Sequence, residues 1–125
     1  MNIALWVVQA LLMVGFGMAG FMKMSTPYPE LNQALPYTAD LPEALVRFIG
    51  TSEVAGALGV ILPAVTRIRP ALTPLAGAGL AIVMVLATGF HAARGEFSAM
   101  PATLVLGALA AFVAWGRWRA RPIAP

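Results

Sequence analysis

The chain contains no cysteine and few charged residues. The absence of Cys among its 125 residues excludes disulfides, thiolate metal sites and dithiol redox chemistry. Only 10% of the residues are charged and 60% are hydrophobic, whereas about a quarter of the residues in soluble domains are charged. So few charged side chains do not cover the surface of a small soluble protein. The composition therefore predicts an integral membrane protein whose main partner is the lipid bilayer.

The pattern of charge also argues against two classes of site. The net charge is +3, but the arginines stand at the ends of apolar segments rather than in a patch with interleaved aromatic residues. Nucleic-acid binding is therefore not expected. His91 is the only histidine, and without cysteine it lacks enough good metal ligands, so no metal site is expected.

Apolar segments of membrane-spanning length are the main feature that the sequence does contain. A helix needs about 20 predominantly apolar residues to cross a bilayer. Four such segments lie at about 3–22, 40–62, 72–93 and 99–116. We therefore predict an all-α fold, an integral membrane four-helix bundle with an external loop between helices 1 and 2. The bundle should form one domain over residues 1–118, followed by a basic, frayed tail over residues 119–125.

The first connection is the longest one, and it contains several helix-breaking residues. "STPYPELNQALPYTADLPE" holds four prolines, so it does not form one regular helix, although a short helical turn around "PELNQAL" fits. Asp40 with Glu43 three residues later has the spacing of a capping box. We expect Asp40 to cap the second helix.

The basic residues predict the orientation of the bundle. Four spans place both termini on one side of the membrane. That side carries more basic residues than the other, namely Arg67, Arg69, Arg117, Arg119 and Arg121 against Lys23, Arg47 and Arg94. Because cytoplasmic loops carry the excess of Lys and Arg, both termini should be cytoplasmic in a multi-pass protein of the cell membrane.

Glu53 is an acidic residue inside the second apolar segment. If that helix begins near Asp40, Glu53 lies roughly 20 Å along its axis, close to the middle of the membrane. An ionised side chain at that depth costs at least about 3 kcal/mol, so Glu53 should face the interior of the bundle. Gly50 and Gly56 share its face at helical spacing and leave room for another helix or a ligand. A purely structural role, as a hydrogen-bonded anchor, is the alternative.

Three further polar residues are placed near Glu53 by this topology. His91 lies near the outer end of the third helix, with Thr88 on its face. Lys23 ends the first helix, where a long side chain usually reaches out to the membrane surface. The candidate ligand pocket therefore lies in the outer half of the bundle and comprises Glu53, His91, Lys23, Thr88, Gly50 and Gly56.

Two motifs resemble those of a known family. "FIGTSEVAGALGVILP" and "PLAGAGLAIVMVLATGFHAARGE", followed by a last helix that ends "AWGRW", resemble the DoxX-like family of small four-helix membrane proteins. The most specific positions are Gly50, Glu53, Gly56 and Ala57, and then His91, Gly95 and Glu96. The resemblance implies a four-helix integral membrane protein, and for some relatives a link to quinone-dependent oxidation or partnership with redox enzymes.

Three functional hypotheses remain open. The first is an accessory or redox-associated membrane protein that binds a quinone or another lipophile in a pocket around Glu53 and His91. A quinone is implied by the family resemblance only, as is a redox enzyme or another membrane subunit as partner. The second is a non-catalytic scaffold or assembly partner of a membrane complex. The third and less favoured is a proton-coupled small-molecule transporter, which would need a homo-oligomer to form a pathway.

Overall fold

The computed structural model describes residues 1–125, and its regular elements are all helical. The all-α prediction is therefore confirmed. The elements are α1 (Asn2–Ser25), α2 (Tyr28–Ala34), η1 (Pro36–Asp40), α3 (Glu43–Gly59), α4 (Leu62–Thr66), α5 (Leu72–Ala93), α6 (Met100–Trp115) and η2 (Gly116–Ala120). Four stretches are long and apolar enough to cross a membrane: Asn2–Ser25, Glu43–Thr66, Leu72–Ala93 and Met100–Ala120.

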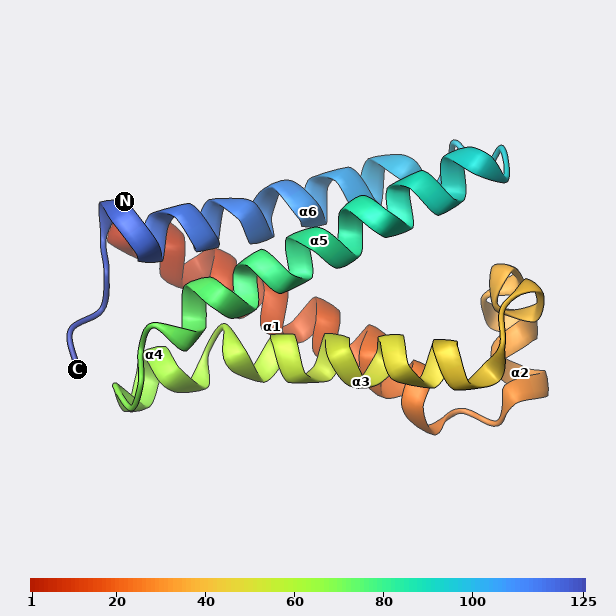
Figure 1. Ribbon diagram of the computed structural model, residues 1–125, viewed down its shortest axis with the longest axis horizontal. Coiled ribbons are helices and arrows are strands. Elements are labelled where there is room, and N and C mark those ends of the chain that lie inside the picture. Colours follow the sequence, from red (N-terminus) through yellow and green to blue (C-terminus); the bar gives the residue numbers. More distant parts are fainter.

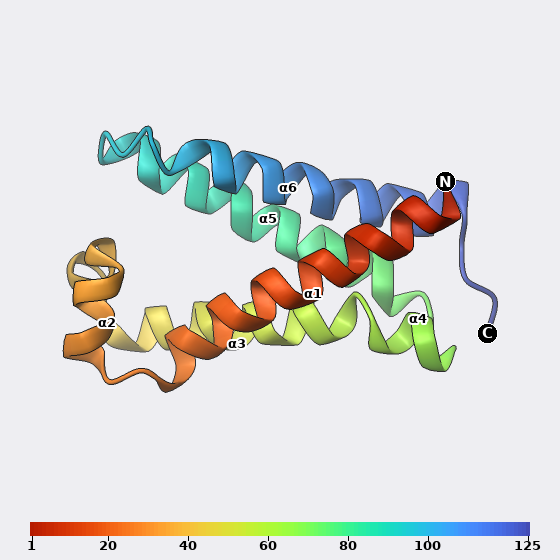
Figure 2. The same ribbon diagram turned by 180° about the vertical axis from the view of Figure 1, so that it is seen from behind.

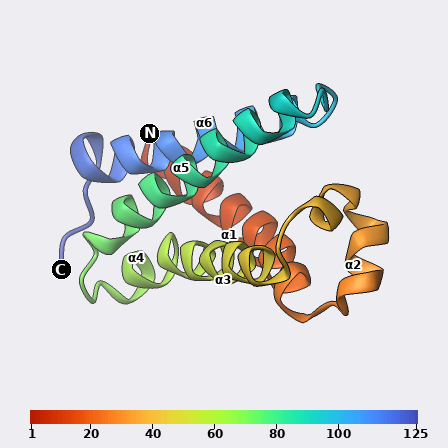
Figure 3. The ribbon, with the colours of Figure 1, turned by 45° about the vertical axis from the view of Figure 1, so that its right-hand side comes forward.

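The long helices form two antiparallel pairs. α1 packs along α3, and α5 packs along α6, with smaller contacts between the pairs. The pairs lie close together at the end that holds both termini, and they diverge towards the opposite end, where α2 lies (Figures 1 and 2). We call these the terminal end and the loop end. The divergence is seen again in the oblique view of Figure 3, where α2 and η1 stand beside the loop end of α3.

Small residues allow the helices within each pair to approach closely. A Cβ atom added at Gly20 of α1 would lie 2.6 Å from the Gly50 carbonyl oxygen of α3. A Cβ atom added at Gly77 of α5 would lie 2.9 Å from the Ala110 carbonyl oxygen of α6. Lipid gives helices no hydrophobic reason to associate, so close packing at small residues is a main source of their attraction.

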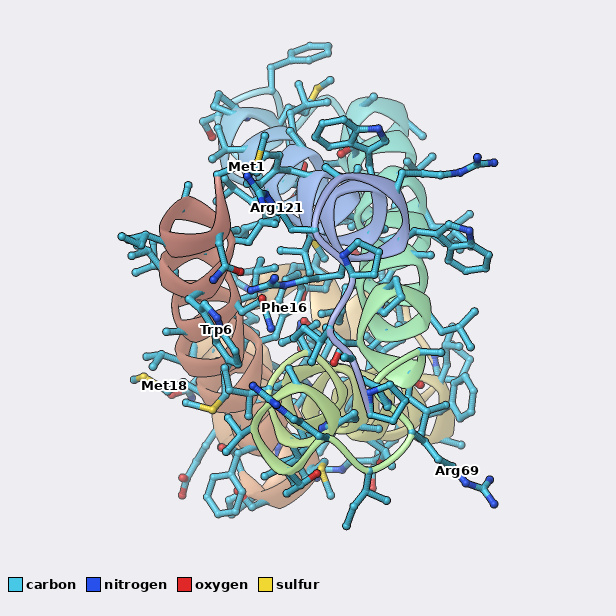
Figure 4. The ribbon with its side chains drawn as sticks, turned by 90° about the vertical axis from the view of Figure 1, so that its left-hand side faces the viewer. Met1, Trp6, Phe16, Met18, Arg69 and Arg121 are labelled. Carbon is cyan, nitrogen blue, oxygen red and sulfur yellow. The ribbon has the colours of Figure 1, made fainter.

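The apolar core lies between the two pairs, away from the loop end. All four long helices contribute to it, through Leu12, Phe16, Ala57, Val60, Leu80, Met84, Ala110 and Val113. Figure 4 looks onto the terminal end and shows Phe16 directed into the bundle, while Met18 points away from it. The outward-facing residues are also large and hydrophobic, as a helix surrounded by lipid requires.

The second span is broken near its end. The second helix was predicted to run to about residue 62, but α3 ends at Gly59. The short helix α4 then continues the path, with Pro63 in its first turn. Proline has no N–H to donate to the helix ladder, so the ladder is interrupted here. The side-chain amide of Gln9 donates to the Val60 carbonyl at 2.6 Å and ties the break to α1.

Two sequence-based expectations about the helix ends are wrong. Asp40 does not cap the second helix, which begins after Pro42 without a side-chain cap, because the Asp40 carboxylate is paired with Arg94 instead. The basic segment after α6 is not frayed from its start, because η2 continues the helical path to Ala120. Arg117 within it is buried and hydrogen-bonded rather than exposed.

Candidate functional site

Glu53 and Lys23 form an ion pair inside the bundle. Glu53 lies in the middle of α3 and is only 2% exposed, which confirms that it faces the interior. The Nζ atom of Lys23, in the last turn of α1, lies 2.6 Å from Oε1 of Glu53. The expectation that Lys23 reaches out to the membrane surface is therefore wrong. An intramembrane carboxylate lowers its desolvation cost by pairing, and Lys23 is close enough to supply the opposite charge.

The close approach of α1 and α3 makes this pair possible. Gly50 lies one turn before Glu53, and a Cβ atom there would lie 2.7 Å from the Cβ of Lys23. The two backbones therefore meet just beside the ion pair. Arg47 fixes the same junction, since its Nη1 donates to the Lys23 carbonyl at 2.8 Å, at the end of α1 where helical carbonyls lack partners.

His91 lies on the other helix pair and is oriented by Glu96. Its Nδ1 atom lies 3.0 Å from Oε1 of Glu96, in the loop that follows α5. This hydrogen bond, with the neighbouring Arg94, holds the pKa of Glu96 below its ordinary value, so Glu96 is ionised at neutral pH. A carboxylate only accepts hydrogen bonds, so Nδ1 carries the proton. In the neutral ring, Nε2 is then free to accept a hydrogen bond.

A cavity of about 350 Å³ lies between α3 and α5, and Tyr37 of η1 also lines it. Its walls are mainly hydrophobic. Lys23 from α1, Glu53 from α3 and His91 from α5 all line it. Such a cavity has the size and character of a small-molecule site, with an apolar body and a few convergent polar groups.

η1 covers the cavity at the loop end. Tyr37 lies edge-on to the rings of His91 and Phe90, with ring centroids 5.2 Å and 5.9 Å away. Next to these rings, Arg94 pairs with both Asp40 of η1 and Glu96. η1 thus connects the end of α5 to the α1–α3 pair, because η1 belongs to the chain between α1 and α3.

The side of the cavity is formed by residues that also face outwards. Phe48 of α3 and Leu86 of α5 line it and are each about two-thirds exposed, at 67% and 69%. In a membrane these two side chains would contact acyl chains. The cavity therefore borders the lipid phase between α3 and α5, and an apolar molecule has a short path into it.

Three of the predicted pocket residues lie elsewhere. Thr88 faces α6, where its hydroxyl donates to the Met84 carbonyl and lies 2.7 Å from the Thr103 hydroxyl. Gly50 packs against α1, and Gly56 packs against Leu80 of α5. The two glycines bring helices together around Glu53, but they do not line the cavity.

Sequence reasoning missed the residues that complete the cavity. Tyr37 lies in the proline-rich connection, where no periodic pattern predicts which side chain faces the bundle. Phe48, Leu86 and Phe90 are ordinary membrane-helix residues, and nothing in their spacing distinguishes a cavity wall from a lipid-facing surface. Glu96 did carry a signal, because it belongs to the "HAARGE" motif at the end of α5.

The comparison with known families agrees with this architecture. A model of the DoxX-like family matches residues 7–113 of the chain. Comparisons with curated proteins and with solved structures found no match. Because the family model covers most of the chain, the protein belongs to the DoxX-like family.

Proposed function

We propose that this DoxX-like protein is an accessory, redox-associated membrane protein that binds a lipophilic molecule in the cavity between α3 and α5. Lipophile binding is supported by the cavity, and the redox association by the family resemblance. The observation that carries the proposal is the convergence of Lys23, Glu53 and His91, from three different helices, on one apolar cavity.

The polar groups favour a ligand with an oxygen-bearing head. Lys23 donates one hydrogen bond to Glu53, and an ammonium group has two further donors. His91 offers Nε2 as an acceptor when its ring is neutral. A carbonyl oxygen accepts from Lys23 only, whereas a hydroxyl group accepts from Lys23 and also donates to His91. A quinone therefore meets the first group, and its reduced form meets both. The apolar body of the ligand would lie along Phe48 and Leu86 and extend towards lipid.

Cavity filling tests the proposal. Ala87 lines the cavity, whereas Ile82 on the same helix is exposed and lines neither this cavity nor the smaller one beside Thr88. We expect organic extracts of the purified wild-type protein, and of the control Ile82→Phe, to contain the same co-purifying lipophile by mass spectrometry. Ala87→Phe should lose it. Both variants should also be titrated with a benzoquinone that carries a ten-carbon tail.

The alternatives predict different results. A scaffold without a ligand predicts that neither extraction nor titration distinguishes Ala87→Phe from Ile82→Phe. A transporter predicts that Glu53→Gln abolishes a proton-coupled flux in proteoliposomes. The fit of an apolar cavity at the lipid boundary favours lipophile binding over both.

A further inference from the structure

Arg117 is a buried cation at the terminal end of the bundle, and it does not line the cavity. It lies in η2 and is only 4% exposed. Its Nε donates to Oε1 of Gln9 at 2.7 Å, and its Nη1 donates to Oδ1 of Asn2 and to the Arg121 carbonyl. The guanidinium also lies 5.0 Å from the ring centroid of Trp6. All of these partners are uncharged groups.

Two buried donors at this end lack a protein acceptor. Nη2 of Arg117 has no hydrogen-bond partner, and neither has Oγ1 of Thr73, in the first turn of α5. The elements that carry them, η2 and α5, pack against each other. A buried donor without an acceptor costs roughly 1–3 kcal/mol, and more when it is charged. Each of these groups would be satisfied by an acceptor oxygen supplied from outside the chain.

The chain also supplies no acidic side chain to balance this charge. Its five acidic side chains belong to the loop end or to the middle of the bundle, as Glu30, Asp40, Glu43, Glu53 and Glu96. The terminal end instead carries further cations, Arg67, Arg69, Arg119 and Arg121. Lys23 at the other end is paired, so Arg117 is the buried cation without an opposite charge.

We propose that Arg117, with Thr73, forms a binding site for a phosphate oxyanion at the terminal end, and that its source is the head group of an anionic phospholipid. The planar guanidinium fork suits phosphate oxygens better than a point charge does. Trp6, Trp115 and Trp118 occur at the same end of the spans, which places Arg117 near the level of lipid head groups. The exposed arginines around it attract anionic lipid.

The residues beyond η2 give this site a means of opening. Arg121 supplies one acceptor to Arg117, and it lies beside Met1 over the end of the bundle, as Figure 4 shows. The chain after Ala120 forms no regular element. A phosphate oxygen would replace the Arg121 carbonyl on Nη1 and add a bond to Nη2, so binding displaces only this short segment.

Native mass spectrometry of the full chain in detergent tests the proposal. With phosphatidylglycerol and phosphatidylcholine in equal amounts, the wild-type protein should retain phosphatidylglycerol selectively. Arg117→Gln should weaken this retention about tenfold or more, because that is the free energy of one lost charge-assisted hydrogen bond. Arg119→Gln is the matched control, because it removes the same charge from an exposed side chain at the same end and should weaken retention far less than Arg117→Gln.

Two further measurements keep the proposal testable if Arg117→Gln does not fold. Thr73→Val keeps the charge and should still weaken retention, and Arg117→Lys should give an intermediate result.

Inorganic phosphate is titrated in a separate arm of the experiment. Arg117-dependent stabilisation by phosphate but not by lipid would identify free phosphate as the source. Equal retention of both lipids by the wild type, with no effect of phosphate, would overturn the proposal and leave Arg117 held by its neutral partners alone.

Discussion

The Nζ atom of Lys23 lies 2.6 Å from the carboxylate of Glu53, and this pair joins α1 to α3 beside the cavity. Both side chains are largely buried, at 12% and 2% exposure. Their charges cancel, so the polar wall of the cavity is close to neutral on this side. The pair therefore holds α1 against α3 and leaves this wall of the cavity without net charge.

Removing one member of this pair should destabilise the bundle more than removing both. Breaking a buried ion pair leaves an unpaired charge and costs on the order of 3–5 kcal/mol, whereas an apolar replacement of both partners is often close to neutral. We expect Lys23→Met and Glu53→Gln each to lower the melting temperature in detergent, and the double variant to recover part of the loss. A double variant with the sum of the single losses would contradict this coupling.

The close approach of α1 and α3 at Gly50 leads to a second prediction. The Cβ of Gly50→Ala would lie 2.8 Å from the Gly20 carbonyl, and backbone does not move aside cheaply. We expect a loss of about 1–3 kcal/mol, as for other overpacked sites. Gly79→Ala in α5 is the control, because no atom lies within 4 Å of its added Cβ. Denaturation in mixed micelles should separate the two variants, and equal stabilities would show that α1 and α3 separate more readily than we infer.

The membrane fold follows from the sequence because it depends on length and composition. A helix that satisfies its own backbone needs only enough apolar residues to span the bilayer, and the third span was predicted to the residue. The inward position of Glu53 follows from the same physics, since lipid penalises an exposed charge. Polarity within apolar spans singled out Glu53 and His91 as candidates, and both positions also belong to the motifs that resemble the family.

The cavity could not be derived in this way, because it depends on how the helix pairs diverge. The sequence places Thr88 on the face of His91, but α6 packs there and engages it. Arg117 reads as an exposed basic residue in a tail, and only Gln9 and Asn2, more than a hundred positions earlier, explain its burial. Contacts of this separation leave no local periodic signal.

The loop that follows α5 and carries Glu96 should loosen in acid. The pKa of Glu96 is lowered in the folded protein, first by its hydrogen bond with His91 and then by Arg94. Its contribution to stability is therefore fully present above the ordinary carboxyl value of 4.5 and is lost as the pH falls through the lower folded value. The loop should then move away from the end of α5.

Spin labels can measure this movement, because the chain has no cysteine of its own. Labels at Ala39→Cys and Ser98→Cys should report a short distance at neutral pH and a broader, longer distribution once the pH has fallen well below 4.5. Asp40→Asn should broaden the distribution at neutral pH, whereas Glu30→Gln, which makes no ion pair, should not. A distribution unchanged by acid would mean that the loop keeps its place without the charge of Glu96.

Both termini should face the cytoplasm, because the terminal end carries the exposed arginines. A membrane-impermeant maleimide added to intact cells should label Gln33→Cys at the loop end. It should label Ala124→Cys only after the membrane is permeabilised. The reverse pattern would invert the bundle, and it would also place the phosphate site proposed at Arg117 in the outer leaflet.

The charge of the Lys23–Glu53 pair should determine which ligands the cavity prefers, if it is a binding site. With both residues present the pair is neutral, so a medium-chain alcohol should bind better than the carboxylate of the same chain length. Glu53→Gln keeps the shape of the side chain but leaves Lys23 without its counter-ion. The carboxylate should then gain about tenfold in affinity, because a charge-assisted hydrogen bond to Lys23 is stronger than a neutral one by roughly 1.4 kcal/mol.

The same pair of probes separates a ligand site from a structural anchor. Lys23→Met leaves Glu53 as the only charge of the pair and should weaken carboxylate binding, opposite to Glu53→Gln. Ala87→Phe should abolish the binding of both probes, and Ile82→Phe should change neither, since only the first side chain enters the cavity. Isothermal titration in detergent gives all of these affinities. If the two probes bind alike in every variant, Glu53 and Lys23 act only to hold α1 against α3, and the scaffold function is the better account of this protein.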